Sequence, residues 1–145
     1  MNLLENNITD PDFIQTLIPQ RPPFVMVDKV FYFSQKKIVS GLTITNDHLF
    51  SKNGTFEAPG LIENMAQTIA LHTGYQFYLK KEAVPTGYIG AIKKVEIDSL
   101  PTIGQELMTT AIILHNIMGV TLVSATIECD GTIIASSEMK TVLAS

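Results

Sequence analysis

The chain has 145 residues and a mass of 15.9 kDa, a length that suits one domain with one hydrophobic core. Hydrophobic residues make up 46% of it and charged residues 17%, which excludes an intrinsically disordered chain. The 14 acidic residues outnumber the 10 basic ones, and the formal net charge of -4 argues against nucleic-acid binding.

The first half of the chain predicts a short helix, two strands and a loop. Residues 1–10 are polar, and we expect them to be loose. The short helix has Asp10 as its N-cap and Pro11 at its first position. The loop contains two turn signals, Asn53-Gly54 and Pro59-Gly60. In chain order the four predicted elements cover 12–17, 24–33, 37–45 and 46–59.

The next segment, residues 61–80, predicts one long helix and is the most informative part of the chain. Its apolar residues leave no wide polar face. A helix of this kind is buried on nearly all sides. We therefore expect it to lie at the centre of the molecule.

Four strand-like runs follow, with no further helix: 86–98, 106–116, 120–129 and 132–143. Asp130-Gly131, before the last run, signals a tight hairpin. This order predicts an α+β fold in which an antiparallel sheet of about six strands wraps around the helix, the hot-dog fold. We expect one such domain over 1–145. Its open sheet edge predicts pairing with a second copy, and hence a homodimer.

Glu63 is the only carboxylate of the long helix, and we expect it in the first turn. Burial favours the neutral carboxylic acid, whereas the helix N-terminus favours the ionised form. A carboxyl group between these two influences is a candidate general acid or base. The alternative is a solvent-facing glutamate that only complements the helix dipole.

Three further polar residues are candidates for a role beside Glu63. Gln67 lies one helical turn later, and it either orients the carboxylate or binds a buried loop. His48 precedes the helix, and it is either an acid/base partner at neutral pH or an exposed loop histidine. His72 is half a turn out of phase with Glu63, so we expect a core histidine with a satisfied ring.

No metal or cofactor site is predicted, because the sequence has no Cys/His cluster with metal-ligand spacing and no glycine-rich phosphate loop. The single cysteine, Cys129, excludes an internal disulfide and has no base near it in the sequence. Residues 1–10 lack the features of a signal peptide, and no apolar run reaches the roughly 18 residues of a membrane span. We expect a cytoplasmic protein with no membrane partner.

Three motifs carry a resemblance to a known enzyme family. They are LIPQRPPFVMVDKV at 17–30, ENMAQ at 63–67, and YIGAI at 88–92 followed by Pro101, Gly104 and Leu107. They resemble the Leu-Pro-His-Arg-x-Pro-Phe-x-x-Val-Asp, Glu-x-Met-Ala-Gln and Gly-Ile … Pro-x-x-Gly-x-x-Leu motifs of the beta-hydroxyacyl-carrier-protein dehydratases. Within that family the sequence is most similar to the dehydratase-like proteins of aryl-polyene pigment clusters, whose helix starts Ile-Glu-x-Met-Ala-Gln.

The resemblance implies an active site shared across a dimer interface. In the family, the histidine of a Gly-His-Phe-Pro loop removes the proton alpha to a thioester, and the helix carboxylate helps the beta-hydroxyl to leave as water. Glu63 matches the carboxylate. Gly60 and Leu61, through backbone N–H groups at the helix N-terminus, and Gln67 are the implied substrate-binding residues. No cofactor is implied.

The sequence departs from the family at both of its histidines. The Gly-His-Phe-Pro motif is absent, with His48 next to its place, and Gln20 stands in the Leu-Pro-His position. Three interpretations stay open. The first is a (3R)-hydroxyacyl-carrier-protein dehydratase-like protein of fatty-acid, polyketide or aryl-polyene synthesis, either with His48 as base or catalytically degenerate. The second is an acyl thioesterase that uses Glu63, and the third is a non-catalytic partner subunit of an active dehydratase.

The implied substrate is an acyl thioester on an acyl carrier protein or on coenzyme A. The implied assembly is a homodimer or a heterodimer with a related hot-dog subunit. Lys93 and Lys94 are candidates for binding an acidic carrier protein or its phosphopantetheine phosphate. The alternative is that both lysines are merely solvated.

Overall fold

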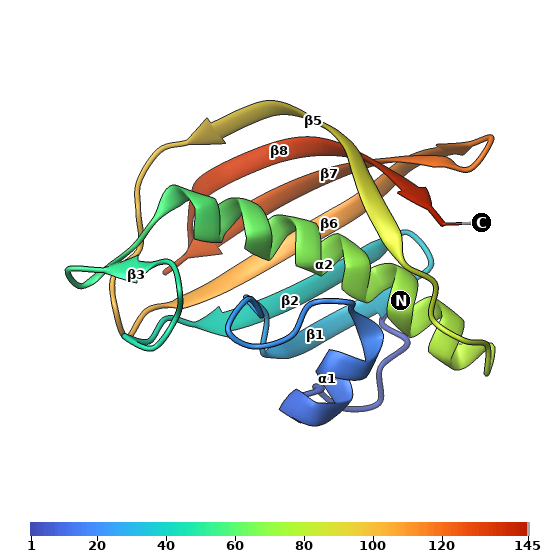
Figure 1. The fold of residues 1–145 in the computed structure, drawn as a ribbon, viewed down its shortest axis with the longest axis horizontal. Helices are drawn as coiled ribbons and strands as arrows, with labels where there is room; N and C mark the ends of the chain where they lie inside the picture. Colours follow the sequence, from blue (N-terminus) through green and yellow to red (C-terminus); the bar gives the residue numbers. More distant parts are fainter. Residues whose placement is uncertain (145) are drawn as a thin grey trace.

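A curved six-stranded sheet and one long helix dominate the computed structural model, which describes residues 1–144 (Figure 1). The helices are α1 (Pro11–Leu17) and α2 (Ala58–Leu79). The strands are β1 (Lys29–Ser34), β2 (Lys37–Thr43), β3 (Ser51–Lys52), β4 (Thr55–Phe56), β5 (Gly87–Ile97), β6 (Glu106–Ile117), β7 (Val120–Cys129) and β8 (Thr132–Leu143).

The large sheet has the strand order β1-β2-β6-β7-β8-β5, and every neighbouring pair is antiparallel. Figure 1 shows α2, in green, lying along the sheet inside its curve. The predicted α+β hot-dog architecture is therefore confirmed. Asp130 and Gly131 have φ values of 52° and 79°, and the two positive values suit a two-residue hairpin between β7 and β8.

The strand predicted over 24–33 begins only at Lys29, because α2 takes the backbone groups of the residues before it. The N–H of Met26 donates to the side-chain oxygen of Gln67, and its carbonyl accepts from Asn64. The carbonyl of Phe24 accepts from Gln67 as well. With these groups satisfied by side chains, the segment crosses α2 and does not extend the sheet.

The helix α2 begins at Ala58, three residues earlier than predicted, so Pro59-Gly60 is not a turn. Proline is tolerated in a first helical turn, where its missing N–H is not needed. Gly60 packs so closely that a Cβ there would lie 2.4 Å from the ring of Phe56. The other turn signal, Asn53-Gly54, does form a hairpin, which joins β3 to β4.

Residues 1–10 are ordered against β1, so the expectation of a loose segment is wrong. The N–H of Leu3 donates to Phe33, and Ile8 and Val30 exchange two backbone hydrogen bonds of 2.9 Å. The reason is that β1 is an edge strand, whose unpaired backbone groups need partners. The opposite edge, β5, has no comparable covering segment within the described chain.

Candidate active site

Glu63 lies half-buried in the second turn of α2, and the expectation of a first-turn position is wrong. The cause is the early start of the helix at Ala58, which leaves no acidic residue in the first turn. Stabilisation by the helix dipole is strongest within that first turn. The environment of Glu63 therefore depends mainly on its side-chain neighbours.

Gln67 is the neighbour that holds Glu63 in place. Its Nε2 donates to Glu63 Oε2 at 3.0 Å and to the carbonyl of Phe24 at 2.8 Å, and its Oε1 accepts the N–H of Met26 at 2.6 Å. A backbone N–H only donates, which fixes the orientation of the amide. Gln67 is fully buried, so both roles predicted for it, orienting the carboxylate and binding a loop, occur together.

The second carboxylate oxygen of Glu63 has no hydrogen-bond partner within residues 1–144. It is also absent from the buried polar atoms that lack a partner, so solvent or a ligand can reach it. The arrangement is a half-buried carboxyl group with one oxygen fixed and one oxygen available. Such a group can donate or accept a proton at a defined position.

A second line of polar residues on α2 faces the sheet, and the sequence analysis identified only one of them, His72. Asn64 and Thr68 are fully buried, and His72 is nearly so. Asn64 donates to Met26 at 2.8 Å and accepts from Thr109 on β6 at 2.6 Å. The spacing of four residues was the available signal, because it places all three side chains on one helix face.

His72 is the core histidine with a satisfied ring that the sequence predicted. Its Nε2 donates to the carbonyl of Ser34 at 2.9 Å, and its ring lies 5.0 Å from that of Phe33. Burial lowers the pKa of His72, an effect opposed in part by the hydrogen bond to Ser34. The ring is therefore part of the core and not of the site around Glu63.

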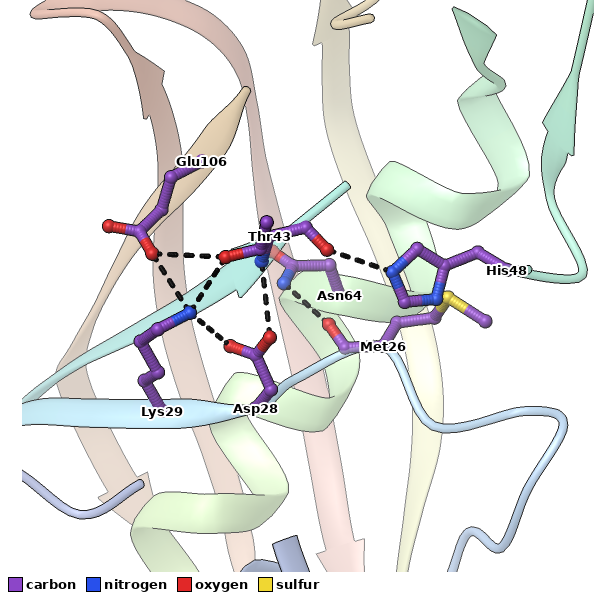
Figure 2. A network of polar contacts seen from close by, with 7 residues as sticks. All are labelled: Met26, Asp28, Lys29, Thr43, His48, Asn64 and Glu106. Carbon is purple, nitrogen blue, oxygen red and sulfur yellow. Dashed lines mark hydrogen bonds and ion pairs between the residues drawn. The ribbon is translucent and has the colours of Figure 1, made fainter. Parts of the chain in front are cut away.

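His48 is bound to its own loop and makes no hydrogen bond to Glu63. Its Nε2 donates to the carbonyl of Thr43 at 3.0 Å, and its ring meets Phe56 edge-on. A carbonyl only accepts, so Nε2 carries the proton. Figure 2 shows the ring turned toward Thr43 at the end of β2. The contacts of His48 are those of a residue that anchors the loop after β2.

An ion-pair network fixes the other side of Thr43 (Figure 2). Lys29 Nζ lies 2.9 Å from Asp28, 2.8 Å from Glu106 and 2.9 Å from Thr43 Oγ1, while Asp28 accepts the N–H of Thr43. Burial opposes the charge of Lys29, but its bonds to Glu106 and Asp28 prevail and raise its pKa. The hydrogen bond from Lys29 lowers the pKa of Glu106. The network joins β1, β2 and β6 beneath the loop of His48.

The two residues predicted to bind substrate through their backbone lie one turn before Glu63. The N–H of Gly60 donates to the carbonyl of Glu57 at 2.9 Å, and that of Leu61 donates to the same carbonyl at 3.4 Å. The side chain of Leu61 is fully buried. Of the two N–H groups, that of Leu61 has the longer and weaker bond to give up to a ligand.

Lys93 and Lys94 lie on the edge strand β5, and both are exposed. Lys94 has a φ of 51° at a bulge, and its Nζ is 3.4 Å from Glu138 on β8. The ammonium group of Lys140 lowers the pKa of Lys93. The three lysines form a basic patch in which Glu138 is the acidic member.

Within residues 1–144, no three His, Cys, Asp or Glu side chains gather as a metal site would require. None of the described helices is long and apolar enough to cross a membrane. Cys129 is buried, and burial raises the pKa of its thiol, which disfavours the nucleophilic thiolate.

Comparison with known proteins identifies the family. The family model of the ApeP-like proteins, described as ApeP dehydratase, matches residues 13–145. The chain belongs to the ApeP-like dehydratase family. It is 29% identical over 140 residues to the 3-hydroxyacyl-acyl-carrier-protein dehydratase FabZ of Vibrio cholerae, covering 92% of this chain and 89% of that protein. It is 27% identical to the FabZ of Vibrio atlanticus, with 92% and 91% covered.

Solved structures show the same fold at lower identity. The dehydratase heterocomplex ApeI:P of Xenorhabdus doucetiae matches with a TM-score of 0.84 at 20% identity, covering 91% of each chain. A hypothetical thioesterase with coenzyme A from Streptococcus pneumoniae matches with a TM-score of 0.65 at 9% identity, covering 80% of this chain and 84% of that one. Family and relatives together make the chain a hydroxyacyl-carrier-protein dehydratase-like protein and favour this over a thioesterase.

In this ApeP-like chain, the ENMAQ motif acquires a structural meaning. Its glutamate is Glu63, and its glutamine is Gln67, which hydrogen-bonds to Glu63. Its asparagine is Asn64, which faces the sheet and bonds to Thr109. The motif therefore positions the carboxylate and also fixes α2 against the sheet and the segment of Met26.

Proposed function

We propose that this chain supplies Glu63 to a 3-hydroxyacyl-thioester dehydratase whose site is completed by a second hot-dog subunit. The observation that carries the proposal is the carboxyl group of Glu63, with Oε2 fixed by Gln67 and Oε1 available. Membership of the ApeP-like dehydratase family supports the reaction class. The proposed carrier of the acyl group is an acyl carrier protein, the carrier named for the FabZ relatives.

The proposed reaction is an elimination of water. A base removes the proton on the carbon alpha to the thioester carbonyl, and the electron pair forms the alpha–beta double bond. Glu63, as the neutral acid, gives its proton to the departing beta-hydroxyl, which leaves as water. The backbone N–H groups of Gly60 and Leu61 are proposed to stabilise the negative charge on the thioester oxygen.

The base is proposed to come from the second subunit. Nε2 of His48 donates to Thr43, which leaves Nδ1 as the basic nitrogen of the ring, but no hydrogen bond joins His48 to Glu63 within residues 1–144. A second copy of this chain would also lack the Gly-His-Phe-Pro histidine of the family. We therefore propose a heterodimer with a related hot-dog subunit that carries the loop histidine. The match to the ApeI:P heterocomplex supports this assembly.

The edge strand β5 is the proposed contact surface for that subunit. Ile92 is paired with Met139, which is fully buried beneath α2, so both side chains lie on the helix side of the sheet. Ile92 is nevertheless 43% exposed. Tyr88 and Val95 are exposed on the same strand. An open edge with uncovered apolar side chains is typical of a site for strand pairing.

Lys93 and Lys94 remain a proposal for carrier binding, supported by the basic patch that they form with Lys140. Reversing both charges, Lys93→Glu with Lys94→Glu, is expected to slow association with an acyl carrier protein, because rim charges act mainly on the association rate. The matched control reverses Lys36 and Lys37 at the β1–β2 turn. Equal rates for both double variants would contradict the proposal.

A cytoplasmic location also stays a prediction.

The function is tested by assaying a 3-hydroxyacyl carrier protein with this chain alone and with a histidine-bearing hot-dog subunit added. The expected result is dehydration by the mixture only, followed as the absorbance of the new enoyl thioester. Rates are expected to survive His48→Ala. Dehydration by this chain alone, lost on His48→Ala, would instead establish His48 as the base. Release of free thiol would establish a thioesterase.

A further inference from the structure

The two edges of the large sheet differ in how their backbone groups are used. β1 and β5 stand at opposite ends of the strand order, and Figure 1 shows them at opposite edges of the sheet. Uncovered N–H and carbonyl groups of an edge strand can pair with a strand of another molecule. Residues 1–8 occupy these groups on β1, whereas β5 has no comparable cover within residues 1–144.

Backbone hydrogen bonds attach both ends of this segment to β1. At one end, Ile8 donates its N–H to the carbonyl of Val30 and accepts the N–H of Val30, both at 2.9 Å. At the other end, the N–H of Leu3 donates to the carbonyl of Phe33 at 2.7 Å. Such an exchange of two bonds is the pattern of an antiparallel ladder. Residues 1–8 therefore act as a short, interrupted strand beside β1.

The side chain of Asn2 completes the cover between those two points. Its Nδ2 donates to the carbonyl of Phe31 at 3.1 Å, and its Oδ1 accepts the N–H of Phe33 at 3.0 Å. A carboxamide has the donor and the acceptor of a peptide group, so Asn2 takes the place of one peptide of a neighbouring strand. Leu4 and Ile8 pack against the core, which adds apolar burial to these bonds.

The β1 edge, if uncovered, is complementary to the β5 edge of another copy. Every neighbouring pair in the six-stranded sheet is antiparallel, so the two edge strands run in opposite directions. A copy placed with its β5 beside β1 would therefore continue the antiparallel sheet. Each copy added in this way leaves another free edge, and head-to-tail contacts that do not close build open chains. A subunit with a single usable edge stops at a pair.

We propose that residues 1–8 limit assembly by closing the β1 edge against β5 of a second copy, so that subunits join through β5 alone. The proposal rests on the proposed function only in taking β5 as the open edge. A two-fold contact through β5 occupies the open edge of this chain. Once that contact has formed, β1 offers no free backbone groups from which the sheet could grow.

The test removes the groups that bond the segment to β1. The edge variant, Asn2→Ala with Ile8→Pro, loses the carboxamide of Asn2 and the N–H of Ile8, and with them three bonds to β1. The matched control, Asn7→Ala with Thr9→Pro, makes the same kinds of change at two exposed residues of the same segment. Light scattering of each protein alone over a dilution series measures its mass.

Wild type and control are expected to reach at most two chains at every concentration. The edge variant is expected to exceed two chains, with a mass that keeps rising with concentration. Adding Ile92→Glu on β5 to the edge variant is expected to bring the mass back to two chains or fewer, because it places a charge in the contact between β5 and β1.

Hydrogen exchange reports whether the segment has left β1 and whether the core is intact. In the edge variant the amide of Phe33 is expected to exchange about tenfold faster, because Asn2 no longer accepts its proton. The amide of Ala125 on the central strand β7 is expected to keep its protection. If Ala125 loses protection as well, the single variant Asn2→Ala is judged by the same two measurements.

Four results would overturn the proposal. They are a wild type that exceeds two chains, a faster Phe33 amide without an increase in mass, an unchanged Phe33 amide, and growth of the edge variant that Ile92→Glu does not reduce. All of these measurements use this chain without substrate. The proposed dehydratase function can therefore fail independently.

Discussion

The two polar lines on α2 differ in how completely their hydrogen bonds are satisfied. Asn64 and Thr68 face the sheet, and their side chains bond to Met26, Thr109 and Ser40 inside the molecule. The line of Glu63 and Gln67 ends at a carboxylate oxygen without a partner. The line of Asn64 and Thr68 is complete without a ligand, whereas the line of Glu63 and Gln67 is not.

This difference separates structural from functional polarity on a single helix. The residues of both lines are half or fully buried. Both lines consist of polar residues spaced four apart on the same helix, so the spacing alone does not distinguish them. Only the line of Glu63 and Gln67 has an atom that a substrate can bind, the free carboxylate oxygen of Glu63.

The largest expected effect on stability comes from removing the hydrogen bonds of Asn64, in the line that faces the sheet. Asn64→Ala leaves the hydroxyl of Thr109 and the carbonyl of Met26 without partners, and we expect a loss of about 3 kcal/mol in the free energy of unfolding. Urea denaturation measures it. The exposed Asn116→Ala on β6 is the control and should change the value by less than about 0.5 kcal/mol. A loss below about 1 kcal/mol for Asn64→Ala would show that the line is not a structural unit.

The next largest effect is expected on assembly through the edge strand β5. If β5 is the contact surface, Ile92→Glu introduces an uncompensated charge into an apolar interface and should weaken assembly at least tenfold by an order-of-magnitude estimate. Light scattering of the complex over a dilution series measures the change. Ile133→Glu on β8, also exposed, is the control. Equal masses for both variants at every concentration would count against the β5 surface.

A smaller effect is expected from His72 as the pH falls. Burial lowers the pKa of His72 below its usual value of 6.5, so the unfolded chain binds a proton more readily than the folded one. The stability due to the neutral ring is present above pH 6.5 and is lost as the pH falls through the folded-state pKa. His72→Gln should flatten the urea midpoint between about pH 7.5 and 5 relative to wild type. The exposed His115→Gln should not, and identical slopes for all three proteins would refute the assignment.

The smallest effect on stability is expected in the line of Glu63 and Gln67. Glu63→Gln keeps an oxygen that accepts from Gln67 Nε2, so the free energy of unfolding should change by less than about 0.5 kcal/mol. The contrast with Asn64→Ala, one residue away, is the sharpest form of the comparison. A loss as large as that of Asn64→Ala would erase the distinction between the two lines.

Local sequence signals predicted the strands and the fold well. β7 and β8 have the predicted bounds, because alternating side chains and the Asp130-Gly131 turn depend only on neighbouring residues. The start of α2 was missed because Pro59-Gly60 is compatible with either a turn or the first turn of a helix. It signals a turn in isolation, but the close contact with Phe56 selects a helix.

The site was predicted less completely, because its contacts join distant parts of the chain. Glu63 and Gln67 stand out in the sequence at their helical spacing. The roles of Asn64 and Thr68 depend on Thr109 and Ser40, which only the folded sheet brings to them. Likewise, the bond of His48 to Thr43 follows from the path of the loop after β2, which no local pattern fixes.

The central claim is that Glu63 supplies a proton to the reaction without stabilising the fold. Its most direct test is kcat/KM for dehydration by the complex of this chain with a histidine-bearing hot-dog subunit, with Glu63→Gln in this chain alone. We expect a loss of about 100- to 10,000-fold with an unchanged urea midpoint, and no loss for the exposed Glu128→Gln on β7. A Glu63→Gln complex that keeps the wild-type rate would contradict the claim.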